Sequence, residues 1–433
     1  MRQHFAQSGR ASLSLFFVFM IIAVVSMALA VRLPQVQSTL DTVVSAQMSP
    51  SPNPLNFKTK FVSFEPLRSL TTAQAQSSIR SFLGGQNVRA IYPVDVYTLK
   101  FEVTVEDGSY SPITAQVFVP KSETPGEHFP LFVYAAGTTG LDDRCSPLKE
   151  NQSRPSFGNY INQMVTQASQ GFVVVLPNYE GFDNPDRIHY YFNSDLEARV
   201  LLGVSREVLN ARQTRSLPIQ PNTLFFGGYS QGGHASFAAA DYVSKYTPEL
   251  KISGIIGHGP TTNIYELLKD NPNLAPYLMY AYQAYYDDFK PEELLTTREL
   301  ERLGRAKDLC VDQAFQYNST SQRMTYNADF LAALLNNTVK EKYPAAAERM
   351  DENSSGTQYE GIPTLIVQGD RDPIVTIEFQ KQFADQLCEN NVPVTFAEYK
   401  GLDHFQSRMR SFTDTNFWIR EIVNGQQVNK MCN

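Results

Sequence analysis

The chain has 433 residues, of which 42% are hydrophobic and 12% aromatic, and its formal net charge is −7. This is ample material for a large core, and the length fits either two domains or one long α/β domain. The acidic balance argues against nucleic-acid binding as the main function.

The first 31 residues are typical of a segment that directs a chain out of the cytosol. Residues 11–31 carry no charge, Arg2 and Arg10 precede them, and Arg32 follows. The basic start and the small residues of Ala28-Leu29-Ala30 favour a cleaved signal peptide. The alternative is an uncleaved signal anchor, because about 20 apolar residues can span a bilayer. The sequence therefore predicts a secreted protein or, alternatively, one with membrane anchoring through residues 11–31 and the rest of the chain outside the cytosol.

A flexible linker and then an α/β sheet are predicted beyond this segment. Residues 32–56 are rich in Ser, Thr, Gln and Pro, a composition typical of linkers. Alternating apolar and polar residues over 99–105 and 115–119 predict an antiparallel hairpin. Continuous apolar runs follow near residues 131, 172, 224, 252, 364 and 393, separated by helical stretches. This pattern predicts an open, mostly parallel sheet covered by helices.

The pentapeptide Gly228-Tyr229-Ser230-Gln231-Gly232 carries the strongest chemical signal. It follows the apolar run Leu224-Phe225-Phe226 and precedes the helix-compatible residues 234–240. A strand, the pattern G-x-S-x-G and a helix form a nucleophile elbow, a sharp turn that exposes the serine Oγ above the sheet. Glycine at positions 228 and 232 removes Cβ atoms that would clash where strand and helix come close. We therefore expect Ser230 to be a nucleophile, with an ordinary glycine-rich turn as the alternative.

The elbow predicts an acid and then a histidine later in the chain. His404 is both late and placed in a loop, Gly401-Leu402-Asp403-His404-Phe405. We expect His234, on the helix that leaves the elbow, to be a packing or surface residue. The other histidines precede the serine or end the next strand: His4, His128, His189 and His258. His404 is therefore the candidate base.

The acid is expected in the turn 368–373, directly after the apolar strand 364–367. Asp372 lies deeper in this turn and Pro373 stiffens it, so Asp372 is favoured. Asp370 is the rival, and its other role would be to hold the turn by side-chain hydrogen bonds. Asp403 is a further rival, although adjacent residues rarely orient each other well. In this scheme His404 accepts the serine proton, and Asp372 fixes the tautomer of the imidazole.

An oxyanion that forms at the serine needs preorganised N–H donors. The backbone N–H of Gln231, the residue after the nucleophile, is expected to be one of them. The second is expected from the loop after the strand 131–136, where Thr138 is favoured over Thr139. A plain turn is the alternative for that loop.

A long insert interrupts the predicted sheet between residues 258 and 364. The gap is far longer than a simple crossover needs and its pattern is helical, so we predict a cap or lid over residues 261–360. The core is then residues 57–260 and 361–433. Six rings in the insert form either an aromatic wall for an apolar acyl chain or ordinary helix packing: Tyr277, Tyr280, Tyr282, Tyr285, Tyr286 and Phe289.

Together these motifs resemble the secretory lipase family of α/β-hydrolases, best known from fungi. The specific part is Gly137-Thr138-Thr139-Gly140-Leu141-Asp142-Asp143-Arg144-Cys145 combined with the elbow. The blocks Pro177-Asn178-Tyr179-Glu180-Gly181-Phe182, Gly369-Asp370-Arg371-Asp372-Pro373 and Asp403-His404-Phe405 follow the family order. The resemblance implies an α/β-hydrolase fold with a helical cap, and hydrolysis of an apolar ester or lipid substrate without a cofactor or metal. It leaves the acyl length open, because the family includes lipases and also esterases or deacetylases of smaller metabolites.

One departure from other hydrolases affects the oxyanion loop. The strand before that loop ends Ala135-Ala136-Gly137, where many hydrolases have a His-Gly pair. The second donor, Thr138, therefore rests on the position of its loop alone.

Four cysteines in a chain outside the cytosol predict disulfides, and the sequence alone allows three pairings. The family resemblance implies Cys145–Cys310, between the cap and the oxyanion loop, and Cys388–Cys432, between the C-terminal tail and the core. No pair has C-x-x-C spacing, so a zinc site is not expected. Four sequons are candidate glycosylation sites in a secreted eukaryotic chain: Asn151, Asn318, Asn336 and Asn353.

A lipase or esterase is the leading functional hypothesis, with a deacetylase of small secondary-metabolite esters as a variant of it. A serine peptidase of the same fold is the second enzyme hypothesis, although nothing in the sequence marks an anchor for a peptide end. An inactive hydrolase-like binding protein is the non-enzyme hypothesis, and the intact Ser230, Asp372 and His404 argue against it.

Overall fold

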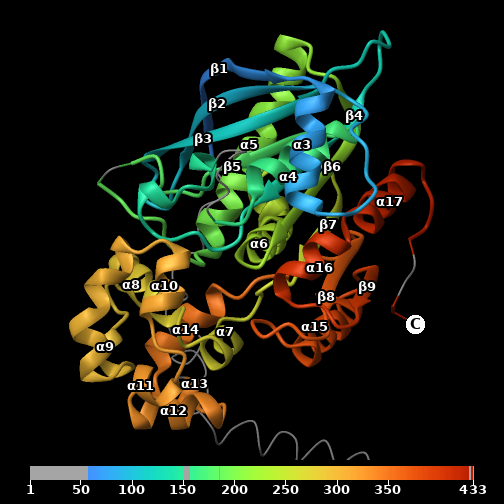
Figure 1. Ribbon diagram of the computed structural model, residues 1–433. Helices are drawn as coiled ribbons and strands as arrows, with labels where there is room; N and C mark the ends of the chain where they lie inside the picture. The colour runs from blue at the N-terminus through green and yellow to red at the C-terminus, as the bar shows by residue number, and fades with distance from the viewer. Residues whose placement is uncertain (1–56, 151–156, 185, 429–430, 433) are drawn as a thin grey trace, which may run out of the picture. The chain divides into compact units, whose positions relative to one another are not determined.

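The computed structural model describes residues 57–150, 157–184, 186–428 and 431–432 (Figure 1). The predicted targeting segment and linker, residues 1–31 and 32–56, lie outside this part of the chain, and so does Asn151. Over the described ranges, no helix combines the length and apolar character that crossing a membrane requires.

The described chain forms a nine-stranded sheet in the order β1-β2-β3-β5-β4-β6-β7-β8-β9. The pairings among β1, β2, β3 and β5 are antiparallel, whereas every pairing from β5 through β4 to β9 is parallel. The carboxyl ends of the parallel strands therefore share one edge, where open α/β sheets bind ligands. The strands are β1 (Thr59–Leu70), β2 (Val94–Thr104), β3 (Tyr110–Pro120), β4 (Phe129–Ala135), β5 (Val173–Pro177), β6 (Ile219–Tyr229), β7 (Ile252–His258), β8 (Thr364–Gly369) and β9 (Val394–Tyr399).

The predicted mostly parallel sheet is confirmed, with the hairpin present as β2 and β3 and the six central strands as β4 to β9. The edge strand β1 was not predicted. Most of its residues are exposed, and its register against β2 shifts between Phe61 and Ser63 and again between Pro66 and Arg68. Such irregularities break the two-residue alternation by which a strand is recognised in a sequence.

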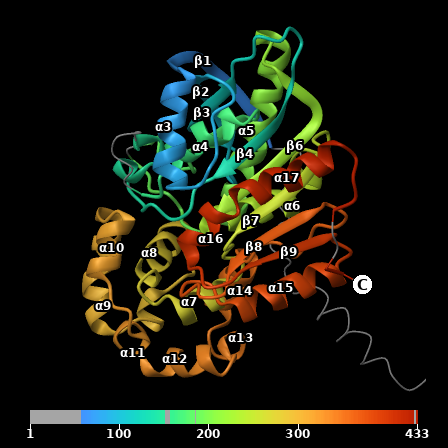
Figure 2. The same cartoon turned by 45° about the vertical axis from the view of Figure 1, so that its right-hand side comes forward.

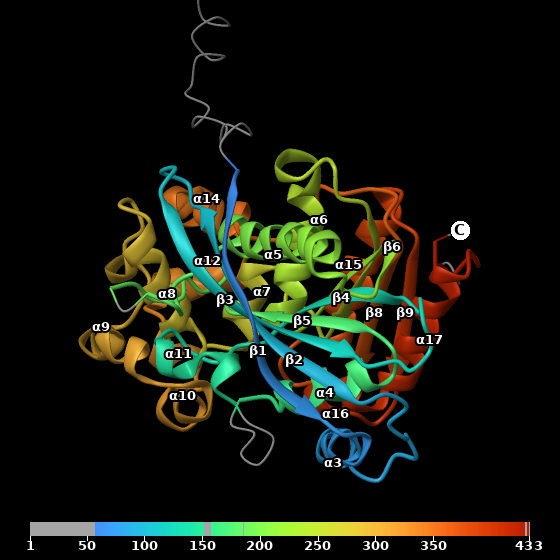
Figure 3. The same ribbon diagram turned by 90° about the horizontal axis from the view of Figure 1, so that it is seen from above.

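Helices cover both faces of the sheet (Figure 3). Because the central strands are covered on both sides, consecutive residues such as Val173, Val174 and Val175 are all apolar and fully buried. One face carries α5 (Ser194–Arg215), α6 (Gln231–Tyr246) and α15 (Ile377–Glu389), and the other carries α3 (Thr72–Leu83), α4 (Tyr160–Ser169) and α17 (Phe412–Val423). The sheet is thus a rigid frame for the residues at its carboxyl edge.

Helical segments fill the chain between β7 and β8 (Figure 2). They pack around a core of their own, which is completed by apolar side chains from the loops after β4 and β5. Tyr277, Tyr282 and Phe289 are buried in this core, so helix packing accounts for these three rings. The helices are α7 (Ile264–Asp270), α8 (Ala275–Tyr285), α9 (Thr297–Arg302), α10 (Val311–Tyr317), α11 (Gln322–Thr325), α12 (Ala328–Leu335), α13 (Val339–Lys342) and α14 (Pro344–Glu352).

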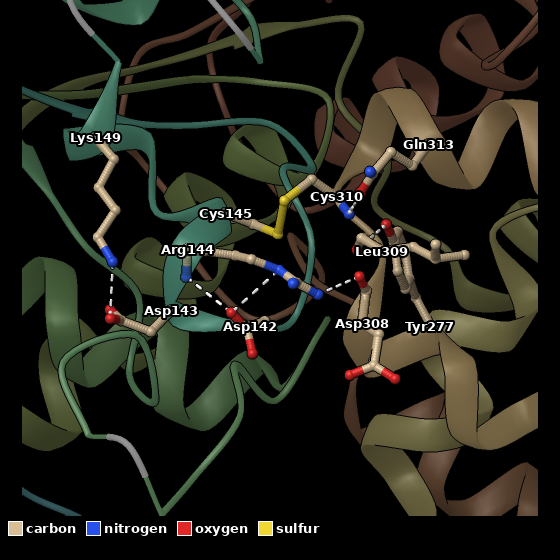
Figure 4. Close-up of a disulfide and its surroundings, with 10 residues drawn as sticks. All are labelled: Asp142, Asp143, Arg144, Cys145, Lys149, Tyr277, Asp308, Leu309, Cys310 and Gln313. Carbon is tan, nitrogen blue, oxygen red and sulfur yellow. Dashed lines mark hydrogen bonds and ion pairs between the residues drawn. A yellow bond between two sulfur atoms is a disulfide. The ribbon is translucent and has the colours of Figure 1, made fainter.

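Both cysteine pairs implied by the family resemblance are disulfide-bonded. The Cys145–Cys310 bond joins the loop after β4 to the helical insert (Figure 4). Beside it, the carbonyl oxygen of Thr139 accepts a 2.8 Å hydrogen bond from the backbone N–H that follows Cys310. The Cys388–Cys432 bond joins α15 to the C-terminal tail. The first disulfide therefore fixes the insert to the predicted oxyanion loop.

Removing the Cys145–Cys310 disulfide by a double alanine substitution should lower the free energy of unfolding by about 2–5 kcal/mol. The same change at Cys388–Cys432 should cost about 1 kcal/mol less, because it opens a separation of 44 residues instead of 165. Urea unfolding of the two double variants measures both losses. A larger loss for Cys388–Cys432 would show that loop closure is not the dominant effect.

The described sequons differ in exposure. Asn336 is exposed and Asn318 is half-buried, and both stay predicted glycosylation sites. Asn353 is 1% exposed, and its Nδ2 atom donates to Tyr286 Oη at 2.7 Å and to the Arg349 carbonyl oxygen at 2.8 Å. A glycan would have to occupy this atom, so the Asn353 candidate is corrected: its amide is a buried structural group.

Candidate active site

Ser230 lies at the turn between β6 and α6, where the nucleophile elbow was predicted. Its backbone φ is 56° and its ψ is −115°, a strained conformation for a residue with a side chain. Its N–H donates to the His258 carbonyl oxygen at 3.0 Å, and its own carbonyl oxygen accepts from Gly233 N at 2.9 Å. The neighbouring strand and the first turn of α6 thus hold the serine in this conformation.

The glycines of the elbow are required by close backbone approaches. A Cβ on Gly228 would lie 1.9 Å from the Gly232 carbonyl oxygen, and one on Gly232 would lie 2.0 Å from the Ala135 carbonyl oxygen. Both distances are far shorter than van der Waals contact, so the predicted clashes are confirmed. The elbow therefore packs directly against the end of β4, where the predicted oxyanion loop begins.

Asp372 and His404 are brought together by the turn after β8 and the start of α16 (His404–Arg410). His404 Nδ1 lies 2.6 Å from Asp372 Oδ2. Asp372 Oδ1 accepts hydrogen bonds from the backbone N–H groups of Ile374 at 2.8 Å and Val375 at 2.9 Å. A carboxylate held in this way fixes the proton on His404 Nδ1 and leaves Nε2 as the basic atom. We call this pair the Asp372–His404 dyad.

The two rival acids have other partners. Asp370 is exposed and accepts a 2.5 Å hydrogen bond from the Gly401 backbone N–H. Asp403 is the N-cap of α16 and accepts from two N–H groups of its first turn, at 3.1 Å and 2.8 Å. Both side chains therefore hold the turns that carry the Asp372–His404 dyad, and neither is hydrogen-bonded to the imidazole in the described chain.

Ser230 and the dyad lie at the same edge of the sheet, since they follow the parallel strands β6, β8 and β9. The ring of Tyr229, next to the serine, is 4.7 Å from the His404 ring between centroids. His404 Nε2 is buried and has no hydrogen-bond partner among the described residues. Catalytic hydrogen bonds are often long without substrate and shorten when it binds. The arrangement therefore leaves His404 Nε2 available as a base.

The loop after β4 lies beside the elbow. A Cβ on Gly137 would come within 2.8 Å of the Tyr229 carbonyl oxygen, and Gly137 N donates to Tyr160 Oη at 2.8 Å. In the described part of the chain, the backbone N–H groups of Thr138 and Gln231 have no acceptor. These two groups are the predicted oxyanion donors, and their unused hydrogens agree with that role.

The sequence motifs did not predict the buried polar network that lies beside the elbow. Glu197 on α5 and His189 before it contact the Gln231 side chain, and His234 contacts Glu197. His234, expected to be a packing or surface residue, is fully buried and hydrogen-bonded. These contacts join residues 34 to 42 positions apart. Only the folded chain brings them together, and no local pattern signals them.

Two buried histidines predict that acid destabilises the fold. Burial lowers the pKa of His189 and of His258 to about 3, so both are neutral in the folded chain. In the unfolded chain they bind protons below about pH 6.5. The unfolded state then binds more protons as the pH falls, and each histidine should cost about 2 kcal/mol of stability between pH 7 and pH 5.

Urea unfolding at the two pH values measures this loss. His258→Asn should reduce the loss, whereas the same substitution at the exposed His128 should leave it unchanged. An unchanged pH dependence in His258→Asn would contradict the explanation.

The sheet, the elbow and the helical layers define an α/β-hydrolase fold, which solved structures share. A rice cell wall degrading esterase, LipA from Xanthomonas oryzae, superposes with a TM-score of 0.68 at 15% identity, over 85% of this chain and 99% of that one. Lipase A from Candida antarctica in its closed state superposes with a TM-score of 0.62 at 16% identity, over 88% of this chain and 89% of that one. At these identities the likeness shows the fold alone.

The secretory lipase family model matches residues 160–430, and the chain belongs to this family. A curated relative from Mycobacterium tuberculosis, named "Probable inactive lipase", is 29% identical over 181 residues. The match covers 40% of this chain and 38% of the relative, so the chain spans about two fifths of the length of the relative that it matches.

Proposed function

We propose that the protein is a serine hydrolase of carboxylic esters, a lipase or esterase, that works through Ser230, His404 and Asp372. The observation that carries this proposal is the 2.6 Å contact of His404 Nδ1 with Asp372 Oδ2, at the sheet edge that holds the strained Ser230. Membership of the secretory lipase family supports the same reaction class.

In the proposed reaction, Ser230 Oγ attacks the ester carbonyl while His404 Nε2 takes its proton. The negative charge that develops on the carbonyl oxygen is stabilised by the backbone N–H groups of Gln231 and Thr138. The tetrahedral intermediate collapses when His404 gives the proton to the leaving alcohol, and Ser230 becomes acylated. Water, deprotonated by His404, then releases the acid and restores the serine.

The proposed substrate is an apolar ester or lipid, and the proposed location is outside the cell. Two disulfides support an oxidising location, and the family supports the ester substrate. We propose secretion after removal of residues 1–31, with anchoring through residues 11–31 as the alternative. The helical insert, proposed as residues 261–360, would set the acyl preference as a cap.

A second candidate is an inactive hydrolase-like protein that binds esters without cleaving them. The name of the Mycobacterium tuberculosis relative favours it. The intact Ser230, Asp372 and His404 favour an active enzyme instead, because His404 contacts Asp372 and Ser230 occupies the strained turn of the elbow.

Hydrolysis of p-nitrophenyl esters from two to sixteen carbons tests the proposal. The wild-type protein should cleave at least one chain length, and Ser230→Ala should cleave none above the background. Binding of the esters without turnover by the wild-type protein would favour the inactive candidate.

A further inference from the structure

The side chain of Gln231 is held from two sides, although the proposed function uses only its backbone N–H. Gln231 is 1% exposed, and its Nε2 lies 2.6 Å from His189 Nε2 and 2.7 Å from Glu197 Oε1. An amide nitrogen carries two hydrogens, so both are used. The side chain of this residue therefore has no freedom to turn.

His189, the first of these partners, is itself fixed. Its ring stacks between Tyr179 and Phe182, at centroid distances of 4.7 Å and 5.0 Å. Its backbone N–H donates to the Leu141 carbonyl oxygen at 2.9 Å, in the loop after β4. Burial lowers the pKa of His189 to about 3, so the ring is neutral and its Nε2 can accept a hydrogen from Gln231.

Glu197, the second partner, is held by His234. Glu197 Oε2 lies 2.6 Å from His234 Nδ1, and His234 Nε2 lies 2.6 Å from the Asn353 carbonyl oxygen. A carbonyl oxygen only accepts, so His234 Nε2 carries a hydrogen, while His234 Nδ1 is engaged by Glu197 Oε2. Both ring nitrogens of His234 are therefore occupied. This second histidine–carboxylate pair therefore cannot act as a base on substrate.

Gln231 and His234 stand three residues apart in the first turn of α6, so their side chains share one face. Both reach Glu197 on the neighbouring helix α5. The first turn of α6 is thus attached to α5 at two points. Through His234, it is also attached to Asn353, directly after the last helix of the insert.

We propose that Glu197, His189 and His234 are positioning residues that hold the Gln231 backbone N–H toward the oxyanion. This inference rests on the proposed function, because it assigns a task to the same site. The backbone of Ser230 is strained at its positive φ, and Gln231 follows Ser230 directly as the first residue of α6. A residue whose side chain is bonded on two sides keeps its N–H in place while charge develops on the substrate.

The direct test compares Gln231→Met with Gln167→Met. Gln167 is also a buried helical glutamine, and its Nε2 donates to Asn416 Oδ1 at 2.6 Å on α17, away from the elbow. Gln231→Met keeps the backbone N–H but loses both side-chain bonds, so kcat for a short p-nitrophenyl ester should fall by about 10- to 100-fold with little change in KM. This decrease in kcat is smaller than the decrease of about 10²- to 10³-fold that follows complete removal of an oxyanion-hole donor. Gln167→Met should keep kcat within about threefold of the wild type.

A second pair of variants separates positioning from simple loss of a buried group. Glu197→Gln can still accept from Gln231 and can donate to His234 Nδ1, so its kcat should stay within about threefold of the wild type. Glu197→Met loses both bonds, and its kcat should fall as in Gln231→Met. Glu207→Met, on the same helix with a carboxylate bonded to Thr59, is the matched control and should keep kcat.

The rate at which a fluorophosphonate labels Ser230 completes the test, because formation of the O–P bond with loss of fluoride also places charge in the oxyanion hole. Labelling of the wild type with slow labelling of Gln231→Met and Glu197→Met, when circular dichroism shows both variants to be folded under the assay conditions, supports the inference. Labelling of all variants at the wild-type rate, or equal losses in Glu197→Gln and Glu197→Met, overturns it while the proposed function stands. Absence of labelling and turnover in the wild type would overturn both.

Discussion

Ser230→Ala and His404→Ala are each expected to lower kcat by about 10⁴- to 10⁶-fold, and the double variant should be little worse than either. The reason is that the serine and the imidazole act in one step: without the base the hydroxyl stays protonated, and without the hydroxyl the base has no partner. Initial rates on a short p-nitrophenyl ester, with active-site concentration corrected for folded protein, give these ratios.

Ser236→Ala is the matched control for the serine substitution. Ser236 lies on α6, the helix that begins directly after Ser230, and is fully buried, and its Oγ donates to the Gly232 carbonyl oxygen at 2.9 Å. This variant should keep kcat within a few-fold. Additive losses in the Ser230→Ala/His404→Ala variant would indicate that the two residues act independently and that the proposed unit is wrong.

Asp372→Asn should lower kcat by about 10⁴-fold, whereas Asp370→Asn should change it by less than about tenfold. An asparagine at 372 can present its amide hydrogens to His404 Nδ1, which stabilises the wrong tautomer and removes the basic lone pair from Nε2. Asp370 accepts a hydrogen bond from the Gly401 backbone N–H, which an asparagine oxygen can still accept. The two variants measured side by side distinguish the acids, and a larger loss in Asp370→Asn would transfer the role of acid to Asp370.

The sequence predicted the central sheet and the elbow because their signals are local. A buried parallel strand shows as a continuous apolar run, and the close approach of Gly228 and Gly232 shows as glycine at two fixed positions. For the acid, the sequence favoured Asp372 and left Asp370 and Asp403 as rivals, and the choice among them depends on which carboxylate reaches His404. That contact joins residues 32 positions apart and is visible only in the structure.

The remaining features of the site depend on packing between distant segments. The partners of Gln231 come from the loop before α5 and from α5 itself, and nothing in the residues around Glu197 distinguishes it from a solvent-exposed helical glutamate. The burial of Tyr282 likewise depends on how the insert folds on itself, which ring spacing alone does not determine. The burial of Asn353 could not be predicted either, because a sequon is a three-residue pattern whereas the exposure of its asparagine is a property of the fold.

The acyl-enzyme is the intermediate that tests the proposed function most directly. Wild-type protein mixed with a p-nitrophenyl ester and quenched in acid within milliseconds should gain the mass of one acyl group, and peptide mapping should place it on Ser230. His404→Ala should show no such gain on the same timescale. Turnover of the ester without any acylated protein, or an acyl group on a residue other than Ser230, would contradict the proposed nucleophile.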